Sequence, residues 1–303
     1  MFNRLPAAAA ANQDVLVWKM LFDRQTALLH RRAAPAFCQG LARLGMRREA
    51  IPDLGELSAT VRALSGWELA AVGRPFEPAA FFELLAERRF PIVTRLRPMR
   101  AFDFSPEPDL FHDLFGHVPM LLDEGLADFL HALGQAHRAQ PVGSPARAQL
   151  WALYFFTAEF GLVQYEGQPR LYGAGLLSSA GEIHHCVNEH TPRPAFDLAT
   201  VLRTPVTGTR FQHQYFMLPA WEQLTDCVAE LAGLLAAAEA LARPAKTGPV
   251  ACSSFAPCCF NLVRTARCCC RLWCRGPCWR CTCWCGPPAT APWPTACWAC
   301  CCC

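Results

Sequence analysis

Long apolar runs and dispersed cysteines are both scarce in this 303-residue sequence. No run of eighteen apolar residues occurs, so we expect no membrane-spanning helix. The apolar stretch Ala7–Ala11 is too short for a signal peptide, and Asp14 follows it closely. Only Cys38, Cys186 and Cys227 precede residue 246, which excludes a disulfide framework in that part and predicts a reducing, cytoplasmic environment.

Acidic residues are absent after Glu239, and the composition changes abruptly from about Val250. Sixteen of the nineteen cysteines lie between Cys252 and Cys303, and they include homopolymeric runs that cannot all pair or bind one ion. We interpret residues 246–303 as a Cys-rich tail translated out of frame from GC-rich coding sequence. The alternative is a genuine metal-binding or redox-active module.

The net charge of +3 depends on this tail. From Lys246 onward there are six of the 28 Lys and Arg residues and no acid, which leaves 22 basic against 25 acidic residues before it. A mildly acidic body gives no reason to expect nucleic-acid binding. About 240 residues are enough for a sizeable core, so we predict one domain over residues 1–245.

Two histidines stand five residues apart in the segment PEPDLFHDLFGHVP, as His112 and His117. On a straight α-helix this spacing places two side chains about 140° apart rather than on one face. Gly116 and Pro119 are residue types that end helices. We therefore expect the helix to end between the histidines, with His117 in the following loop, so that both imidazoles converge on one metal ion.

A third candidate ligand lies in the segment LWALYFFTAEFGL, whose pattern predicts a helix buried nearly all round. Glu159 is its only charged side chain, and burial of an unpaired carboxylate is costly. An arginine partner would satisfy Glu159, and so would a metal shared with His112 and His117. These ligand types form the facial triad of non-haem Fe(II) oxygenases, although a zinc hydrolase can use the same set.

Four blocks of the sequence, in the same order, make the chain similar to the pterin-dependent aromatic amino acid hydroxylases. The similarity is strongest to the prokaryotic phenylalanine 4-hydroxylase branch and spans roughly residues 12 to 240. The first block, with the pattern EPDxFHDxxGHxP, is highly specific. The blocks are Ser105–Pro119, Tyr154–Leu162, Tyr172–Glu182 and Phe211–Leu224.

This resemblance implies a mainly α fold (α+β with a few short strands) in a single catalytic domain around a central iron site. The implied cofactors are Fe(2+) and a tetrahydropterin, and the implied reaction is hydroxylation of L-phenylalanine to L-tyrosine with O2. The implied iron ligands are His112, His117 and Glu159. A monomer is expected, because the chain shows neither an extended N-terminal domain nor a C-terminal heptad helix.

The resemblance also implies roles for residues around the metal. Arg97 would bind the substrate carboxylate, a task that suits its planar fork of donors. Phe81 would stack on the pterin ring, although an ordinary core cluster explains it equally well. Tyr154 and Phe155 would form the aromatic wall beside the metal, and Tyr154 is also implied in cofactor binding. The remaining implied substrate-pocket residues are Ser105, Pro108, Phe155 and Ser178.

Phe155 keeps a second substrate open. Phenylalanine and tyrosine hydroxylases usually carry Trp at this position, whereas tryptophan hydroxylases carry Phe. Tryptophan 5-hydroxylation is therefore the alternative within the family. A zinc hydrolase is less favoured because the sequence has no HExxH helix, and a Cys-rich metal-binding protein would require the tail to be genuine.

The hydrophobic pattern predicts most of the chain as helix. Asn12–Arg32 and Met120–Arg138 are amphipathic, and Leu218–Leu241 has a strongly helix-forming Ala and Leu composition. Val201–Phe211 has the breakers and β-branched residues of a loop or short strand.

Overall fold

A computed structural model describes residues 7–74, 77–206, 211–224, 226, 227 and 230, which belong to one compact unit. The predicted tail, residues 246–303, and most of the predicted helix Leu218–Leu241 lie outside the described residues. Among the described segments, no helix is both long enough and apolar enough to cross a membrane.

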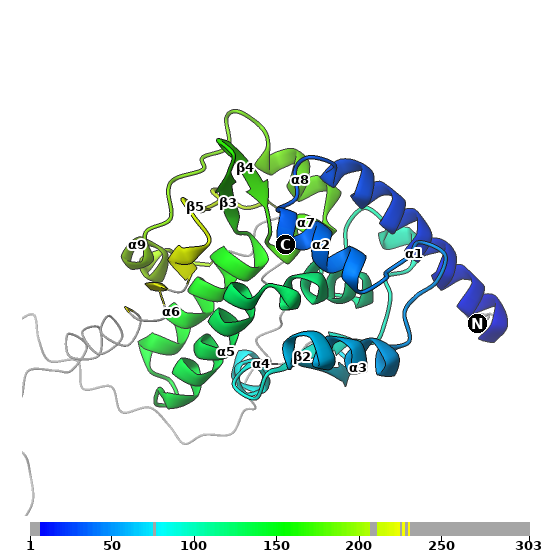
Figure 1. Cartoon of the computed structure of the whole chain (residues 1–303), viewed down its shortest axis with the longest axis horizontal. Helices are drawn as coiled ribbons and strands as arrows, with labels where there is room; N and C mark the ends of the chain where they lie inside the picture. Colours follow the sequence, from blue (N-terminus) through cyan, green and yellow to red (C-terminus); the bar gives the residue numbers. More distant parts are fainter. Residues whose placement is uncertain (1–6, 75–76, 207–210, 225, 228–229, 231–303) are drawn as a thin grey trace, which may run out of the picture. The chain divides into compact units, whose positions relative to one another are not determined.

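The described part of the chain is mainly helical with a few short strands, as predicted (Figure 1). Its α-helices are α1 (Ala7–Leu29), α2 (Pro35–Arg43), α3 (Leu54–Ser65), α4 (Pro78–Leu85), α5 (Glu124–Ala139), α6 (Pro145–Tyr154), α7 (Ala174–Ser178), α8 (Ala180–Cys186) and α9 (Leu198–Arg203). Short 3-10 helices are η1 (Met99–Ala101) and η3 (Val118–Leu122), and two π-helices are η2 (His112–His117) and η4 (Phe155–Glu159). The strands are β1 (Glu68–Val72), β2 (Arg89–Val93), β3 (Leu162–Tyr165), β4 (Gln168–Leu171) and β5 (Met217–Leu218).

The strands form two small sheets rather than a continuous layer. Strands β1 and β2 pair in parallel, from Glu68 opposite Arg89 to Val72 opposite Val93. In the other sheet β3 is central, antiparallel to β4 and parallel to β5. The connection between β1 and β2 contains α4, because parallel neighbours require a crossover. Helix α4 packs against α5, and α5 against α6 (Figure 1).

Several helices begin at side chains that accept a hydrogen bond from the exposed N–H groups of the first turn. Asp53 accepts from Glu56 N at α3, and Asp123 accepts from Leu126 N at α5. Such caps are worth about 1 kcal/mol each. Gly66 ends α3 at a positive φ of 76°, a conformation that glycine adopts without strain.

Two predicted helices are present with shifted bounds. The predicted Asn12–Arg32 corresponds to α1, and Met120–Arg138 corresponds to the end of η3 followed by α5. The loop or strand predicted for Val201–Phe211 is wrong at its start, because Val201–Arg203 complete α9. Asp197 accepts hydrogen bonds from Thr200 there, and this cap overrides the β-branched composition.

An aromatic cluster in the core holds η2 in place between the first two helices. Phe111 and Phe115 stack with ring centroids 4.8 Å apart. Trp18 of α1 meets Phe111 edge-on at 5.4 Å, and Phe37 of α2 meets Phe115 at 5.4 Å. All four side chains are buried, and each such ring pair is worth about 1 kcal/mol beyond its buried area. The segment that carries both histidines is therefore fixed by packing on its opposite face.

Candidate metal centre

His112 and His117 lie at the two ends of the π-helix η2. Hydrogen bonds in a π-helix join residues i and i+5, so wider winding brings side chains five residues apart onto one face. The prediction that the helix ends between the histidines is therefore wrong. The backbone continues through His117 directly into η3. The π winding, rather than a break in the helix, brings the two imidazoles together.

Gly116 serves this segment by its size rather than by ending a helix. A Cβ at this position would lie 3.0 Å from both the Cβ and the carbonyl oxygen of Ala174, the first residue of α7. Glycine lets the two backbones approach closely. The close contact brings α7, and with it Ser178, against the side of η2 that carries His112.

Glu159 ends a second π-helix, η4, which continues directly from α6. The hydroxyl of Tyr154, five residues earlier, donates a hydrogen bond of 2.8 Å to Glu159 Oε1. The same winding that aligns the two histidines thus aligns Tyr154 with Glu159. The prediction of a helix buried nearly all round is confirmed, since Leu150, Leu153 and Phe156 are at most 4 % exposed.

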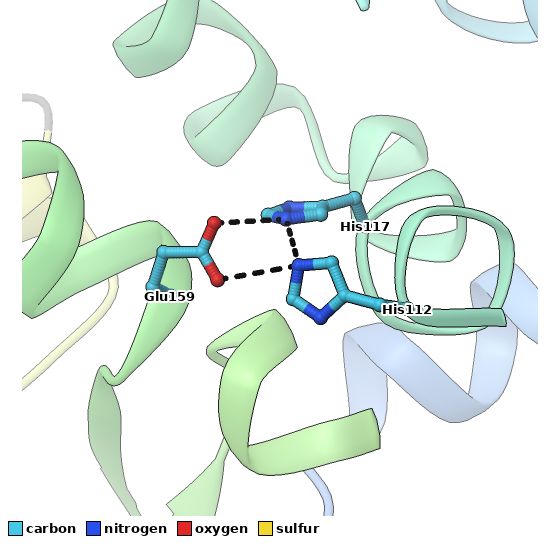
Figure 2. Close-up of side chains that lie close together, drawn as sticks. All are labelled: His112, His117 and Glu159. Carbon is cyan, nitrogen blue, oxygen red and sulfur yellow. Dashed lines mark hydrogen bonds and ion pairs between the residues drawn. The ribbon is translucent and has the colours of Figure 1, made fainter. Parts of the chain in front are cut away.

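The three predicted ligands converge, as Figure 2 shows. His117 Nε2 lies 3.2 Å from His112 Nε2 and 3.1 Å from Glu159 Oε1, and His112 Nε2 lies 3.5 Å from Glu159 Oε2. Two ligands at right angles around a first-row metal, each about 2.1 Å away, lie about 3 Å apart. The spacing of these donors therefore fits a common ion bound by all three.

The second nitrogen of His112 is oriented by Ser178. The Ser178 hydroxyl donates its only hydrogen to Ala174 O at 2.8 Å, while its oxygen lies 2.8 Å from His112 Nδ1. Ser178 must therefore accept from His112, which places the ring hydrogen on Nδ1 and leaves the Nε2 lone pair for a metal. Such an outer hydrogen bond sets the tautomer and raises the basicity of a ligand histidine.

The charge of Glu159 is favoured by its neighbours. Burial alone would raise the pKa of this carboxyl, but the imidazoles of His117 and His112 outweigh burial and hold its pKa well below the usual value. A carboxylate between two imidazoles in an apolar wall is a ready cation site. Two histidines and one carboxylate on one side of an ion match the non-haem Fe(II) triad.

A cavity opens beside the three donors, with a volume of about 1000 Å³ counted out to its mouth. His112 and Glu159 lie in its wall. All five of the predicted substrate residues also line it: Arg97, Ser105, Pro108, Phe155 and Ser178.

Arg97 is held in place by a residue that the sequence analysis missed. Its Nε and Nη2 donate to the two carboxylate oxygens of Asp109, at 2.8 and 2.7 Å, and both side chains are buried. Asp109 also accepts from the backbone N–H of His112. Burial would raise the pKa of Asp109, but Arg97 outweighs it and lowers that pKa. The pair therefore connects the guanidinium directly to the backbone of a candidate ligand.

The two predicted pterin residues are not among the residues that line this cavity. Phe81 is 7 % exposed and meets Tyr154 edge-on, with ring centroids 4.8 Å apart. Tyr154 contacts the metal centre through its hydroxyl bond to Glu159 and by stacking on His117, with ring centroids 6.4 Å apart. The two rings belong to the aromatic layer that supports the metal centre, and their role toward a pterin stays a prediction.

Glu182 is a buried charged residue of the cavity wall to which the sequence pattern assigned no role. It lies in α8, is 6 % exposed and lines the cavity together with Ser178. The hydroxyl of Tyr215 donates to its Oε2. The signal was present, because Glu182 is the only charged residue between Arg170 and His184.

Comparison with known proteins agrees with this geometry. A family model described as biopterin-dependent aromatic amino acid hydroxylase matches residues 2–244. The phenylalanine-4-hydroxylase of Chromobacterium violaceum is 40% identical over 219 residues, which are 72% of this chain and 73% of that protein. That of Ralstonia nicotianae is 41% identical over 215 residues, 70% of this chain and 68% of the other. A crystal structure of the Chromobacterium violaceum phenylalanine hydroxylase with bound iron(III) and 7,8-dihydrobiopterin aligns at a TM-score of 0.70 and 38% identity, over 77% of this chain and 84% of that one.

Proposed function

Because this chain belongs to the biopterin-dependent aromatic amino acid hydroxylases, we propose that its cavity binds an aromatic amino acid beside a ferrous ion and a tetrahydropterin. The chain is a phenylalanine 4-monooxygenase that converts L-phenylalanine to L-tyrosine with O2. The observation that carries this function is the convergence of His112, His117 and Glu159 at the wall of a cavity that also contains Arg97.

The three donors fit iron by their chemistry and would hold it from one side. When bound, ferrous iron and the reduced pterin supply the electrons and the O2 activation that hydroxylation needs. Ser178 keeps the His112 Nε2 lone pair directed at the metal, and Tyr154 fixes one oxygen of Glu159. Both contacts hold the ligand set in a single geometry before any ligand arrives.

Arg97 would bind the carboxylate of the amino acid. Two of its nitrogens are bonded to Asp109, whereas Nη1 makes no hydrogen bond within the described residues and remains for the substrate. Phe155, Pro108 and Ser105 would surround the substrate ring or its backbone. Apolar walls exclude water and so protect the reacting centre from side reactions.

For the pterin we propose the aromatic layer of Phe81 and Tyr154. Tyr154 contacts both Phe81 and the candidate ligand Glu159, so a ring bound at this layer would lie near the metal. Aromatic rings stack favourably on flat conjugated ligands.

L-phenylalanine is favoured over L-tryptophan, because the bacterial relatives and solved structures compared above are phenylalanine hydroxylases. Phe155 is smaller than the Trp usual in phenylalanine hydroxylases and leaves more room beside the metal. Membership of this family also removes the reason to consider a zinc hydrolase.

We further propose that residues 1–245 form the catalytic domain, and that the enzyme is a cytoplasmic monomer that does not bind nucleic acid. The few cysteines before residue 246 and the mildly acidic body support this. For residues 246–303 we propose an out-of-frame origin, so a chain ending at residue 245 should retain full activity. Sequencing of the coding region around Val250 tests that origin directly.

The function is tested by incubating the purified chain with Fe(2+), tetrahydrobiopterin, O2 and each aromatic amino acid in turn, with products identified by mass spectrometry. Tyrosine formed from phenylalanine is the expected result. If 5-hydroxytryptophan formed from tryptophan faster than tyrosine formed from phenylalanine, tryptophan would be the preferred substrate. No hydroxylated product from any of them would overturn the proposed function.

A further inference from the structure

Glu182 is a buried carboxylate that faces the substrate cavity without serving the metal. It lies in α8 (Ala180–Cys186), four residues after Ser178, and its side chain reaches the cavity wall with only 6 % of the residue exposed. It is not one of the three converging donors. Its place in the wall therefore needs another explanation.

The partners of Glu182 hold it in position and leave its charge uncompensated. The buried hydroxyl of Tyr215 donates to Oε2, and the backbone N–H of Gln212 also donates to the carboxylate. No Lys, Arg or His forms an ion pair with it among the described residues. Burial raises its pKa to about 7, against the lowering effect of these two donors.

An unpaired carboxylate in an apolar wall is costly to the fold. That cost is offset if a cation arrives with the ligand. Arg97, which also lines the cavity, already has a carboxylate partner, because it forms an ion pair with Asp109. Among the described residues, Glu182 is therefore an anionic group of the cavity wall without a cationic partner.

An α-amino acid contributes an ammonium group as well as a carboxylate. With Arg97 for the carboxylate and the metal side of the cavity for the ring, the ammonium group is the part of the substrate still without a partner. Resting on the function proposed above, we infer that Glu182 receives the substrate ammonium and that Tyr215 positions its carboxylate for this contact. Contacts to carboxylate, ammonium and ring together would define the chirality of the substrate.

The test compares two ligands that differ only in the ammonium group, L-phenylalanine and 3-phenylpropanoate. Binding of each to the iron-loaded full chain is measured by equilibrium dialysis, for the wild type and for Glu182→Gln. We expect Glu182→Gln to weaken L-phenylalanine binding by about 10- to 100-fold, the size expected for loss of a charge-assisted hydrogen bond. Binding of 3-phenylpropanoate should change less than about 3-fold or improve, because that ligand has no cation for Glu182 to receive.

Glu189→Gln is the matched control, since it makes the same chemical change at an exposed side chain seven residues further on. It should leave both affinities unchanged. An equal loss for both ligands in Glu182→Gln, or no loss for either, would overturn the inference.

A purely structural role for Glu182 makes different predictions. If Glu182 only stabilised the fold, Glu182→Gln would lower the melting temperature. If Glu182 is instead an unpaired buried charge, the same substitution removes that charge and should raise the melting temperature at pH 8. As a second variant, Tyr215→Phe removes a donor and keeps the carboxylate, so it should lower the melting temperature and still bind L-phenylalanine better than 3-phenylpropanoate. If Tyr215→Phe no longer bound L-phenylalanine better than 3-phenylpropanoate while Glu182→Gln still did, the role assigned to Glu182 would also be wrong.

The inference and the proposed function fail in different ways. If wild-type protein binds L-phenylalanine and hydroxylates it while Glu182→Gln keeps normal affinity, the function stands and the role of Glu182 is wrong. If wild-type protein neither binds nor hydroxylates L-phenylalanine, the proposed function itself is wrong.

Discussion

The cavity has a metal end, defined by His112, His117 and Glu159, and a substrate end, defined by Arg97 and Glu182. The two differ in how their charges are satisfied. At the metal end, His112, His117 and Glu159 direct their nitrogen and oxygen atoms at one another, an arrangement that suits a shared cation. At the substrate end, Arg97 has its own carboxylate, Asp109, and its charge is balanced before any ligand binds. The protein therefore leaves open the interactions that a metal would complete, whereas the arginine proposed to bind the substrate carboxylate is paired in advance.

The two ends are also built differently along the chain. The metal ligands come from two π-helices, each of which aligns residues five apart. The substrate end combines an irregular segment, which carries Arg97, with α8, which carries Glu182. The spacing of the candidate metal ligands is therefore set within helical segments. The substrate end depends on residues that are far apart in the sequence and meet only in the folded chain.

The largest effect is expected at the metal end, from Glu159→Gln. The amide keeps the shape of the side chain but removes the charge between two imidazoles, so iron affinity should fall at least about 100-fold. Turnover should fall with it, while circular dichroism stays unchanged. Iron content after dialysis and the rate of tyrosine formation check this. Undiminished hydroxylation in this variant would defeat the ligand assignment, and Glu166→Gln, an exposed turn residue, is the control.

Arg97→Ala tests the substrate end of the cavity and should weaken substrate binding. Loss of the charge-assisted contact should raise the KM for L-phenylalanine by a factor equivalent to about 2–3 kcal/mol, with iron binding retained. Arg95→Ala changes the same residue type at a side chain that is 81% exposed and should leave KM unchanged. Equal kinetics in both variants would return Arg97 to a structural role.

The titration of Glu182 should make stability depend on pH. Its pKa is about 7 in the folded chain, whereas an unperturbed glutamate has a pKa of 4.5, so between these pH values the folded state binds the extra proton. Stability should therefore fall as pH rises from 5 to 8, by roughly 2 kcal/mol. The nearest titratable groups, Tyr215 and Cys186, stay neutral over this range because burial raises both pKa values, that of Cys186 to about 12.

This pH dependence is measured as the difference in free energy of unfolding between wild type and Glu182→Gln. The difference should grow in favour of the Gln variant as pH rises. A constant difference across the range would show that Glu182 has an ordinary pKa in the folded protein.

The smallest effect is expected from Ser178→Ala, which removes the acceptor for His112 Nδ1. Iron affinity should fall about 10-fold, because outer hydrogen bonds of ligand histidines contribute roughly 10- to 100-fold. Ser178→Thr retains the hydroxyl and should restore much of the affinity. A larger change in the KM for L-phenylalanine than in iron affinity would instead assign Ser178 to the substrate end.

The sequence alone predicted the helical class of the fold, which the structure confirms, and the three candidate ligands, which the structure brings together. His112 and His117 flank a specific motif, and Glu159 is the sole charge in a buried segment, so composition and spacing mark them without any coordinates. The positions of the two long helices followed from hydrophobic periodicity. The start of α5 is displaced by a few residues because the Asp123 cap sets its first turn.

Only the tertiary structure decided how these residues meet. Spacing on an α-helix predicted a break between the histidines, but packing of η2 against α1, α2 and α7 stabilises π winding instead. The pairs of Arg97 with Asp109 and of Glu182 with Tyr215 were likewise decided by tertiary contacts. Glu182 and Tyr215 lie 33 residues apart, and no local pattern encodes a contact between groups so distant along the chain. The local sequence pattern determines which side chains are buried. Which buried charged groups contact one another depends on how separate segments of the chain pack together.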